Sequence, residues 1–99
     1  GERVRLVQVL IEAGSMVELT HTIKDPLGFH ARSVMLVAGE CARWKSDMTV
    51  AHGAREASAD DPIALMGLEA HKGDTISVKI SGTDEEDAAD FMAHLLRRL

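Results

Sequence analysis

The stretch ISVKISGTDEEDAADFMAHLL, residues 76–96, decides the fold, because it places a strand and a helix in immediate succession. Its first part alternates apolar and polar residues, and this period of two predicts a strand with one buried face. Thr83 and Glu86 have the spacing of a capping box, in which each side chain bonds a backbone N–H at a helix start. The helix that follows is expected to turn one apolar face inward, formed by Ala88, Phe91, Met92, Leu95 and Leu96.

The rest of the chain from Val17 onward adds three strands and two helices to this pair. Alternation predicts one strand over residues 17–24, and a pair of short strands over residues 48–57 with a turn at His52-Gly53. Apolar residues with helical spacing predict a helix over residues 34–41. A second helix is expected to start at Asp61, with Pro62 in its first turn, and to end before Lys72-Gly73.

The resulting order is β-α-β-β-α-β-α, which predicts a single α+β domain. Each expected strand has one apolar face, so we expect a four-stranded antiparallel sheet with three helices on one face and water on the other. Residues 16–99 are interpreted as this domain. Residues 1–15 are interpreted as an N-terminal extension of uncertain structure, since neither the helical nor the strand period prevails there.

Composition excludes several classes of function. The 99 residues carry a formal net charge of −5, and this acidic balance argues against a nucleic-acid partner. A single cysteine, Cys41, excludes an internal disulfide and a cysteine-based metal cluster. There is no apolar run long enough to span a membrane, and the first residues lack the apolar region of a signal peptide, so a cytoplasmic protein is expected.

Among the five histidines, His30 is the candidate for chemistry, because it directly precedes the first expected helix. The N–H groups and the positive dipole end of a helix start attract anions, and Arg32 adds a permanent cation with bidentate geometry. An imidazole can also act as a nucleophile toward a phosphoryl donor near neutral pH. The alternative is an exposed helix-capping histidine beside a solvated arginine. The other histidines lack metal-ligand spacing, so we expect no metal, and His21 is interpreted as a packed core residue.

Four motifs stand out, GFHARS at 28–33, IALMGL at 63–68, KGD at 72–74 and ISGTDEEDA at 80–88. They resemble those of the histidine-containing phosphocarrier (HPr) family of the bacterial sugar phosphotransferase system. The resemblance covers residues 16–99 without an apparent gap, and it implies the open-faced β-sandwich fold. It further implies that His30 accepts a phosphoryl group on Nδ1 from enzyme I and passes it to enzyme II A components, while Arg32 steadies the phosphoryl oxygens. Such a protein is a monomeric carrier without a cofactor, and an enzyme only in a loose sense.

The resemblance also assigns a docking surface and a regulatory position. Met35, Ile63 and Met66 fall where relatives present an apolar patch to their partners, although core packing is the alternative for all three. Asp61 stands where many relatives have a regulatory serine that becomes phosphorylated. Its carboxylate either imitates the negative charge of that phosphoserine or only caps a helix. Ser33 stands in place of the usual proline, which leaves the start of the first helix less constrained.

Two rival functions remain open at this point. The first is a regulatory module with the same fold, belonging to a nitrogen-linked branch or a dihydroxyacetone kinase system, that signals through the phosphorylation state of His30. The second is a purely structural interaction domain. The sequence does not distinguish the sugar or the branch served.

Overall fold

The computed structural model describes residues 5–11 and 14–99, with side chains described from residue 16 onward. The four strands and three helices expected after residue 16 are present in the expected order, preceded by one further strand. The elements are β1 (Arg5–Ile11), β2 (Gly14–Thr22), α1 (Ala31–Cys41), β3 (Asp47–His52), β4 (Arg55–Ser58), α2 (Pro62–Met66), β5 (Thr75–Ser81) and α3 (Glu85–Leu96).

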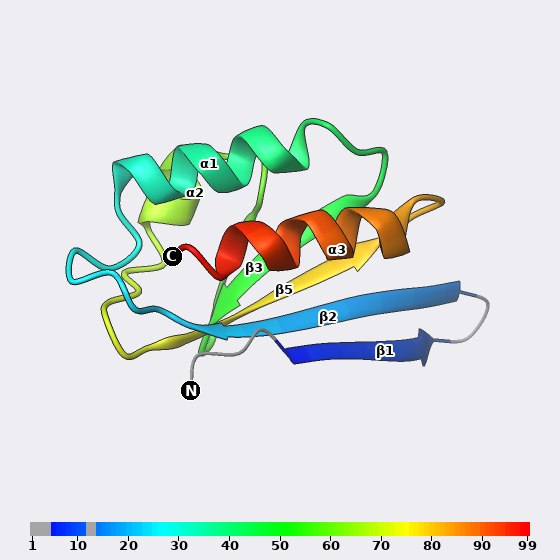
Figure 1. Ribbon diagram of the computed structural model, residues 1–99, viewed down its shortest axis with the longest axis horizontal. Coiled ribbons are helices and arrows are strands. Elements are labelled where there is room, and N and C mark those ends of the chain that lie inside the picture. Colours follow the sequence, from blue (N-terminus) through cyan, green and yellow to red (C-terminus); the bar gives the residue numbers. More distant parts are fainter. Residues whose placement is uncertain (1–4, 12–13) are drawn as a thin grey trace.

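The strands form one antiparallel sheet with the order β1-β2-β5-β3-β4 (Figure 1). Strand β5 occupies the centre, and its register pairs Val78 with Leu19 of β2 and with Val50 of β3. The side chains of all three residues are buried. The alternation that predicted β5 therefore also determined which face of the sheet packs against the helices, because successive side chains point to opposite faces.

Strand β1 settles a question that the sequence left open. It pairs with β2 from Arg5 opposite Thr20 to Ile11 opposite Gly14, so the four expected strands gain a fifth at the edge. Because the local pattern of this segment fits a helix and a strand equally well, the backbone hydrogen bonds offered by the edge of β2 decide in favour of a strand.

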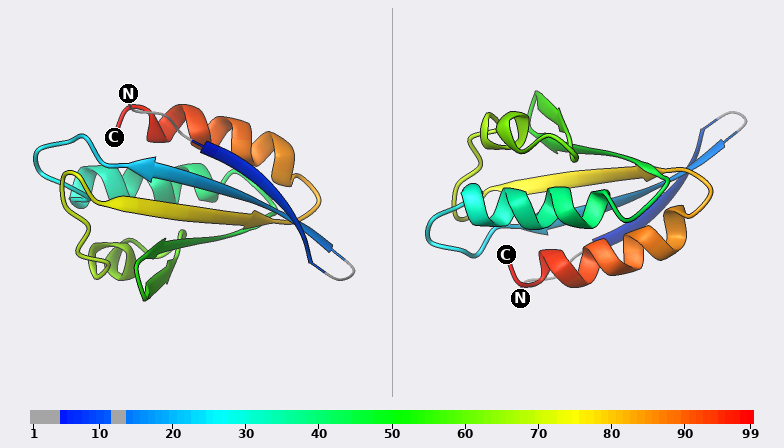
Figure 2. Two further views of the ribbon diagram at one scale, coloured as in Figure 1. Left: turned by 90° about the horizontal axis from the view of Figure 1, so that it is seen from below. Right: turned by 90° about the horizontal axis from the view of Figure 1, so that it is seen from above.

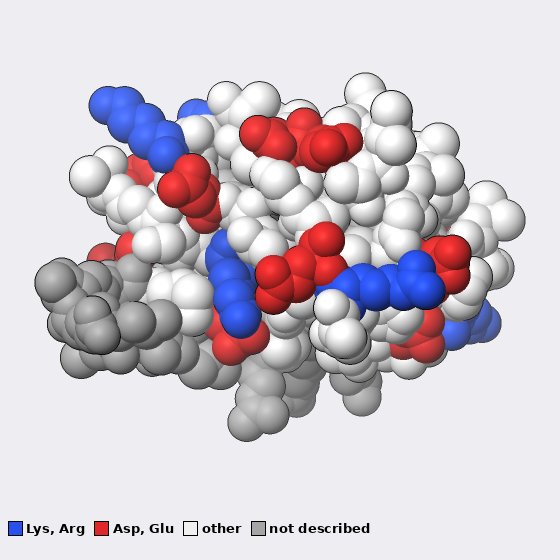
Figure 3. All heavy atoms as spheres, turned by 180° about the vertical axis from the view of Figure 1, so that it is seen from behind, with Lys and Arg blue, Asp and Glu red and all other residues white. Residues whose placement is uncertain are grey.

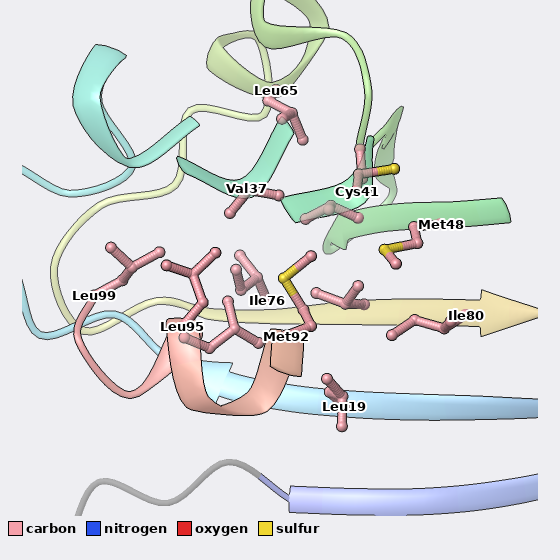
Figure 4. Close-up of a cluster of buried hydrophobic side chains, with 14 of the residues drawn as sticks. Leu19, Val37, Cys41, Met48, Leu65, Ile76, Ile80, Met92, Leu95 and Leu99 are labelled. Atoms are coloured by element: carbon pink, nitrogen blue, oxygen red, sulfur yellow. The ribbon is translucent and has the colours of Figure 1, made fainter. Parts of the chain in front are cut away.

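All three helices lie on one face of the sheet, as Figures 1 and 2 show from three directions. The core fills the space between the two layers and includes Leu19, Val37, Leu65, Ile76 and Met92, which converge in Figure 4. Burial of such side chains contributes about 1.5–3 kcal/mol each to folding. On the face seen from behind, positive and negative side chains are interspersed and neither sign forms a continuous patch (Figure 3). No helix in the described ranges is long and apolar enough to cross a membrane.

The expected capping box at the start of α3 is wrong. The helix is capped at Asp84, whose carboxylate makes no capping bond within the helix. It instead accepts hydrogen bonds from the backbone N–H groups of Lys45 and Ser46 and from the Ser46 hydroxyl. Glu85, rather than the expected Glu86, accepts a backbone N–H before the helix, that of Gly82 at 3.1 Å. A tertiary contact with the loop before β3 thus replaced the local motif.

Two further expectations need correction. Phe91 is 48% exposed, because it lies at the edge of the buried stripe of α3, where its ring rests against Trp44 with a centroid separation of 5.4 Å. Helix α2 ends at Met66 rather than near Lys72, since Gly67 caps it. The only side chain that this short helix buries is Leu65.

Candidate functional site

His30 caps the start of α1, where the sequence placed it. The residue is held by a reciprocal pair of bonds with Ser33, which lies three positions later and is buried. The Ser33 hydroxyl accepts the His30 backbone N–H at 2.8 Å and donates to the His30 carbonyl at 2.9 Å. Ser33 therefore constrains the start of the helix by hydrogen bonding; that this start is less constrained than with proline stays a prediction.

Both nitrogens of the His30 ring have a partner. Nδ1 accepts the backbone N–H of Arg32 at 3.3 Å, and Nε2 lies 3.1 Å from Oδ2 of Asp25. The other carboxylate oxygen of Asp25 accepts the N–H of Leu27 at 2.9 Å. These two interactions, the Leu27 N–H first and His30 second, lower the pKa of the Asp25 carboxyl.

Asp25 was not singled out from the sequence. The signal that could have identified it is the Asp25-Pro26 pair itself, since an aspartate before a tight turn commonly bonds the backbone two residues later. This bond fixes the carboxylate in place. What the sequence could not show is that its second oxygen faces the imidazole.

A hollow of about 50 Å³ lies beside the imidazole, and a second arginine reaches it. Arg32 lines it from α1, as the sequence analysis expects of a cation beside His30, and Arg98 lines it from the end of α3. The backbone N–H groups of Lys24 and Asp25 both donate to the Leu99 carbonyl at 3.0 Å, which ties the end of α3 to the His30 loop. His30 and Asp25 line the same hollow, and the two guanidinium groups suit a tetrahedral anion. Sequence reasoning did not identify Arg98.

The loop before His30 depends on a glycine. Gly28 has a φ of +70°, and a Cβ built there would lie 2.7 Å from the carbonyl oxygen of Ala70. The next residue, Phe29, donates its backbone N–H to that same oxygen at 2.9 Å and buries its ring in the core. The loop that presents His30 is thus pressed against the segment after α2, and only glycine fits the contact.

An apolar surface lies next to the start of α1. Met35 is 60% exposed, Ile63 85% and Met66 45%, and together with Ala31, Val34 and Pro62 they line one shallow apolar depression. The inward face near α2 is supplied instead by Leu65 and Leu68, which are buried. The alternative that Met35, Ile63 and Met66 are core residues is therefore wrong.

Asp61 caps α2 as expected. Its side chain accepts the N–H of Ala64 at 3.1 Å, and Pro62 occupies the first turn of the helix. The carboxylate is exposed, so it adds a negative charge close to Ile63 on the apolar surface. The structure shows the cap; a regulatory role for this residue stays a prediction.

The remaining histidines lie in other surroundings. His52 bonds the Leu68 carbonyl through Nδ1 at 2.8 Å and faces Asp74 through Nε2 at 3.3 Å. His21 is buried, His71 is exposed, and His94 is exposed on α3 with Nδ1 3.4 Å from Arg97. Within the part of the chain that the structure describes, no group of three potential ligands could hold a metal ion.

Comparison with known proteins identifies relatives of this fold and site. The sequence model of a family described as "PTS HPr component phosphorylation site" matches residues 17–98. The phosphocarrier protein HPr of Mycoplasma pneumoniae is 34% identical over 84 residues, which are 84% of this chain and 96% of that protein. The phosphocarrier protein NPr of Proteus mirabilis is 38% identical over 74 residues, or 74% of this chain and 82% of that one. The crystal structure of HPr-C-His from Thermoanaerobacter tengcongensis superposes with a TM-score of 0.75 at 26% identity, covering 81% of this chain and 90% of the other.

The fold and the site together define a small open-faced β-sandwich that presents a histidine at a helix start beside an apolar surface. The chain belongs to the HPr family, the phosphocarrier components of the phosphotransferase system (PTS). Strand β1 lies before the residues that the family model matches.

Proposed function

We propose that His30 carries the phosphoryl group on Nδ1, accepting it from enzyme I and passing it to an enzyme II A component. The observation that carries this proposal is the ring at the start of α1, with Nδ1 directed at the helix and a hollow lined by Arg32 beside it. We further propose that the carrier domain comprises residues 16–99 and acts as a cytoplasmic monomer, and that residues 1–15 form an extension to it.

The chemistry requires one bond to form and one to break. The Nδ1 lone pair attacks phosphorus while the bond from phosphorus to the donor atom breaks, and its electron pair leaves with the donor. The ring gains positive charge as the new N–P bond forms. The guanidinium of Arg32 and the N–H groups at the start of α1 stabilise the negative phosphoryl oxygens, because charge-assisted bonds and the helix dipole both favour an anion there.

Both partners would dock on the surface formed by Met35, Ile63 and Met66. Exposed methionines adapt to differently shaped partners, which suits a carrier that must bind a donor and an acceptor in turn. The surface lies beside Ala31, the residue that follows His30, so a partner seated on it would cover the imidazole and exclude water.

A nitrogen-branch or regulatory carrier is the second candidate, and the similarity to the Proteus mirabilis protein named NPr favours considering it. Both candidates require phosphate on His30, so they differ in the donor and acceptor rather than in the site. Restoration of sugar uptake in cells that lack their own HPr would support the sugar branch. Transfer from a nitrogen-branch enzyme I alone would support the second candidate.

The test is phosphorylation of the purified chain by enzyme I and phosphoenolpyruvate, read by intact mass. We expect one phosphate per chain that is stable in base and labile in acid, as a phosphoramidate is. His30→Ala should abolish it, and His71→Ala, which removes another exposed histidine, should leave it unchanged. Phosphate that persists on His30→Ala would refute the assignment.

A further inference from the structure

The imidazole of His30 has a fixed hydrogen-bonding pattern. A backbone N–H can only donate, so Nδ1, which lies 3.3 Å from the Arg32 nitrogen, accepts and carries no proton. The neutral ring must then carry its proton on Nε2. That nitrogen lies 3.1 Å from Oδ2 of Asp25, an acceptor. The two contacts specify the same tautomer.

Asp25 is itself held in place on three sides. Its Oδ1 accepts the N–H of Leu27, its carbonyl accepts the N–H of Gly28 at 2.8 Å, and its own N–H donates to the Leu99 carbonyl. The carboxylate therefore cannot turn away from the ring without breaking the turn. About a quarter of each side chain is accessible, 26% for Asp25 and 23% for His30, so water only partly screens their contact.

We propose that Asp25 is a positioning residue for phosphoryl transfer, which keeps the proton of His30 on Nε2, so that Nδ1 is unprotonated and can attack once its bond from the Arg32 N–H opens. This inference rests on the proposed function of His30. When Nδ1 attacks phosphorus, the positive charge that develops on the ring is shared with Nε2–H, and the Asp25 carboxylate opposite stabilises it. No proton has to leave the ring in this step.

Another histidine pair in the same molecule supplies an internal comparison. His52 also faces an aspartate through Nε2, but its Nδ1 lies 2.8 Å from the Leu68 carbonyl, which can only accept. Both ring nitrogens of His52 therefore face acceptors, and these contacts do not select one neutral tautomer. Of these two histidines, His30 alone has a donor at one ring nitrogen and an acceptor at the other, so its contacts alone select a tautomer.

The first measurement needs no substitution. Long-range ¹H–¹⁵N NMR spectra report which ring nitrogen is protonated, and they are recorded well above about pH 6.5, the ordinary pKa of histidine. We expect Nε2–H for His30. In Asp25→Asn the amide NH₂ group would face Nε2 while the amide oxygen holds the Leu27 N–H, so the Nε2–H signature of His30 alone should weaken. A parent protein with Nδ1–H on His30 would overturn the proposal.

The second measurement uses phosphoramidate, a small donor that needs no docking and releases ammonia when its phosphoryl group is transferred. The rate of phosphorylation should fall at least about ten-fold in Asp25→Asn, which corresponds to about 1.4 kcal/mol. Part of the phosphate should move to Nε2. Asp90→Asn, which removes an exposed carboxylate from the middle of α3, is the control for net charge and should react like the parent.

These outcomes separate the two proposals. Equal rates and Nδ1 attachment in Asp25→Asn and the parent would overturn the role of Asp25 while His30 remains the carrier. A parent chain that accepts phosphate from phosphoramidate on Nδ1 but from no enzyme I would overturn the proposed function, and the effect of Asp25→Asn on that small-molecule reaction would still support its positioning role.

Discussion

Replacing Gly28 with alanine tests how tightly the loop that presents His30 is fixed. The substitution adds one methyl group at a residue whose φ is +70°, and that methyl would lie 2.7 Å from the Ala70 carbonyl oxygen and 2.9 Å from the His71 Cα. Both contacts are with backbone atoms, which cannot swing aside as the end of a side chain can. Either the loop moves or the clash persists.

The expected loss of stability has two parts. The left-handed backbone conformation costs a residue with a Cβ about 1–2 kcal/mol. Forcing an extra methyl group into a packed contact adds about 1–3 kcal/mol. The free energy of unfolding of Gly28→Ala should therefore fall by about 2–5 kcal/mol in total.

Two other glycines separate these contributions. Gly53 has a similar φ of +61° with no atom within 4 Å of a built Cβ, so Gly53→Ala should cost only the conformational part, about 1–2 kcal/mol. Gly39 lies within α1 with equally open space, and Gly39→Ala should instead stabilise the helix by up to about 1 kcal/mol.

The assay is urea unfolding of the parent and the three variants, followed by far-UV circular dichroism. The slope of free energy against urea should be the same for all four, so that midpoints can be compared directly. We expect the order Gly39→Ala, parent, Gly53→Ala, Gly28→Ala from most to least stable. If Gly28→Ala unfolds at the same urea concentration as Gly53→Ala, the close contact with the segment after α2 does not constrain the loop, and the reasoning fails.

Four further predictions concern the site and its surroundings. Arg32→Ala should slow phosphorylation of His30 about ten- to a hundred-fold, and Arg32→Lys should slow it less, because an ammonium keeps the charge but lacks the planar fork. Ile63→Glu should weaken binding to enzyme I in calorimetric titration while changing the free energy of unfolding by no more than about 0.5 kcal/mol, since the side chain is exposed. Asp61→Ser should become a substrate for a seryl kinase of this system and, when unmodified, should accept phosphate on His30 faster than the parent. Asp84→Asn should be less stable than the parent at neutral pH. Because hydrogen bonds from the Ser46 hydroxyl, the Lys45 N–H and the Ser46 N–H lower the pKa of the Asp84 carboxyl, that difference should shrink as the pH falls below about 4.

Each of these predictions has a result that contradicts it. Unchanged kinetics in Arg32→Ala would make the guanidinium a bystander. A large loss of stability in Ile63→Glu would show that the residue is packed in solution, and equal phosphorylation rates in Asp61→Ser and the parent would leave residue 61 as a helix cap only. A stability difference for Asp84→Asn that persists unchanged below pH 4 would mean that the ionised carboxylate is not what stabilises the contact.

The central strand, the start of α2 and the position of His30 were predictable from the sequence alone. The alternation over residues 76–80 predicted the central strand and its buried face, because a period of two admits few other structures once one face must leave water. Asp61-Pro62 predicted the start of α2 through local capping geometry. The position of His30 at the start of α1 and the surrounding motif were likewise predictable, since a helix start depends mainly on neighbouring residues.

Other features were decided only by the tertiary structure. The carboxylate of Asp84 leaves its own helix to bind the loop at Ser46, and Phe91 turns from the core toward Trp44. Arg98 reaches the hollow beside His30 because the end of α3 is tied to the loop before α1. Strand β1 forms because β2 offers it a hydrogen-bonding edge. These contacts join residues that are distant in the sequence. The free energy of such a contact depends on the distant residue, which the pattern of neighbouring residues does not reveal.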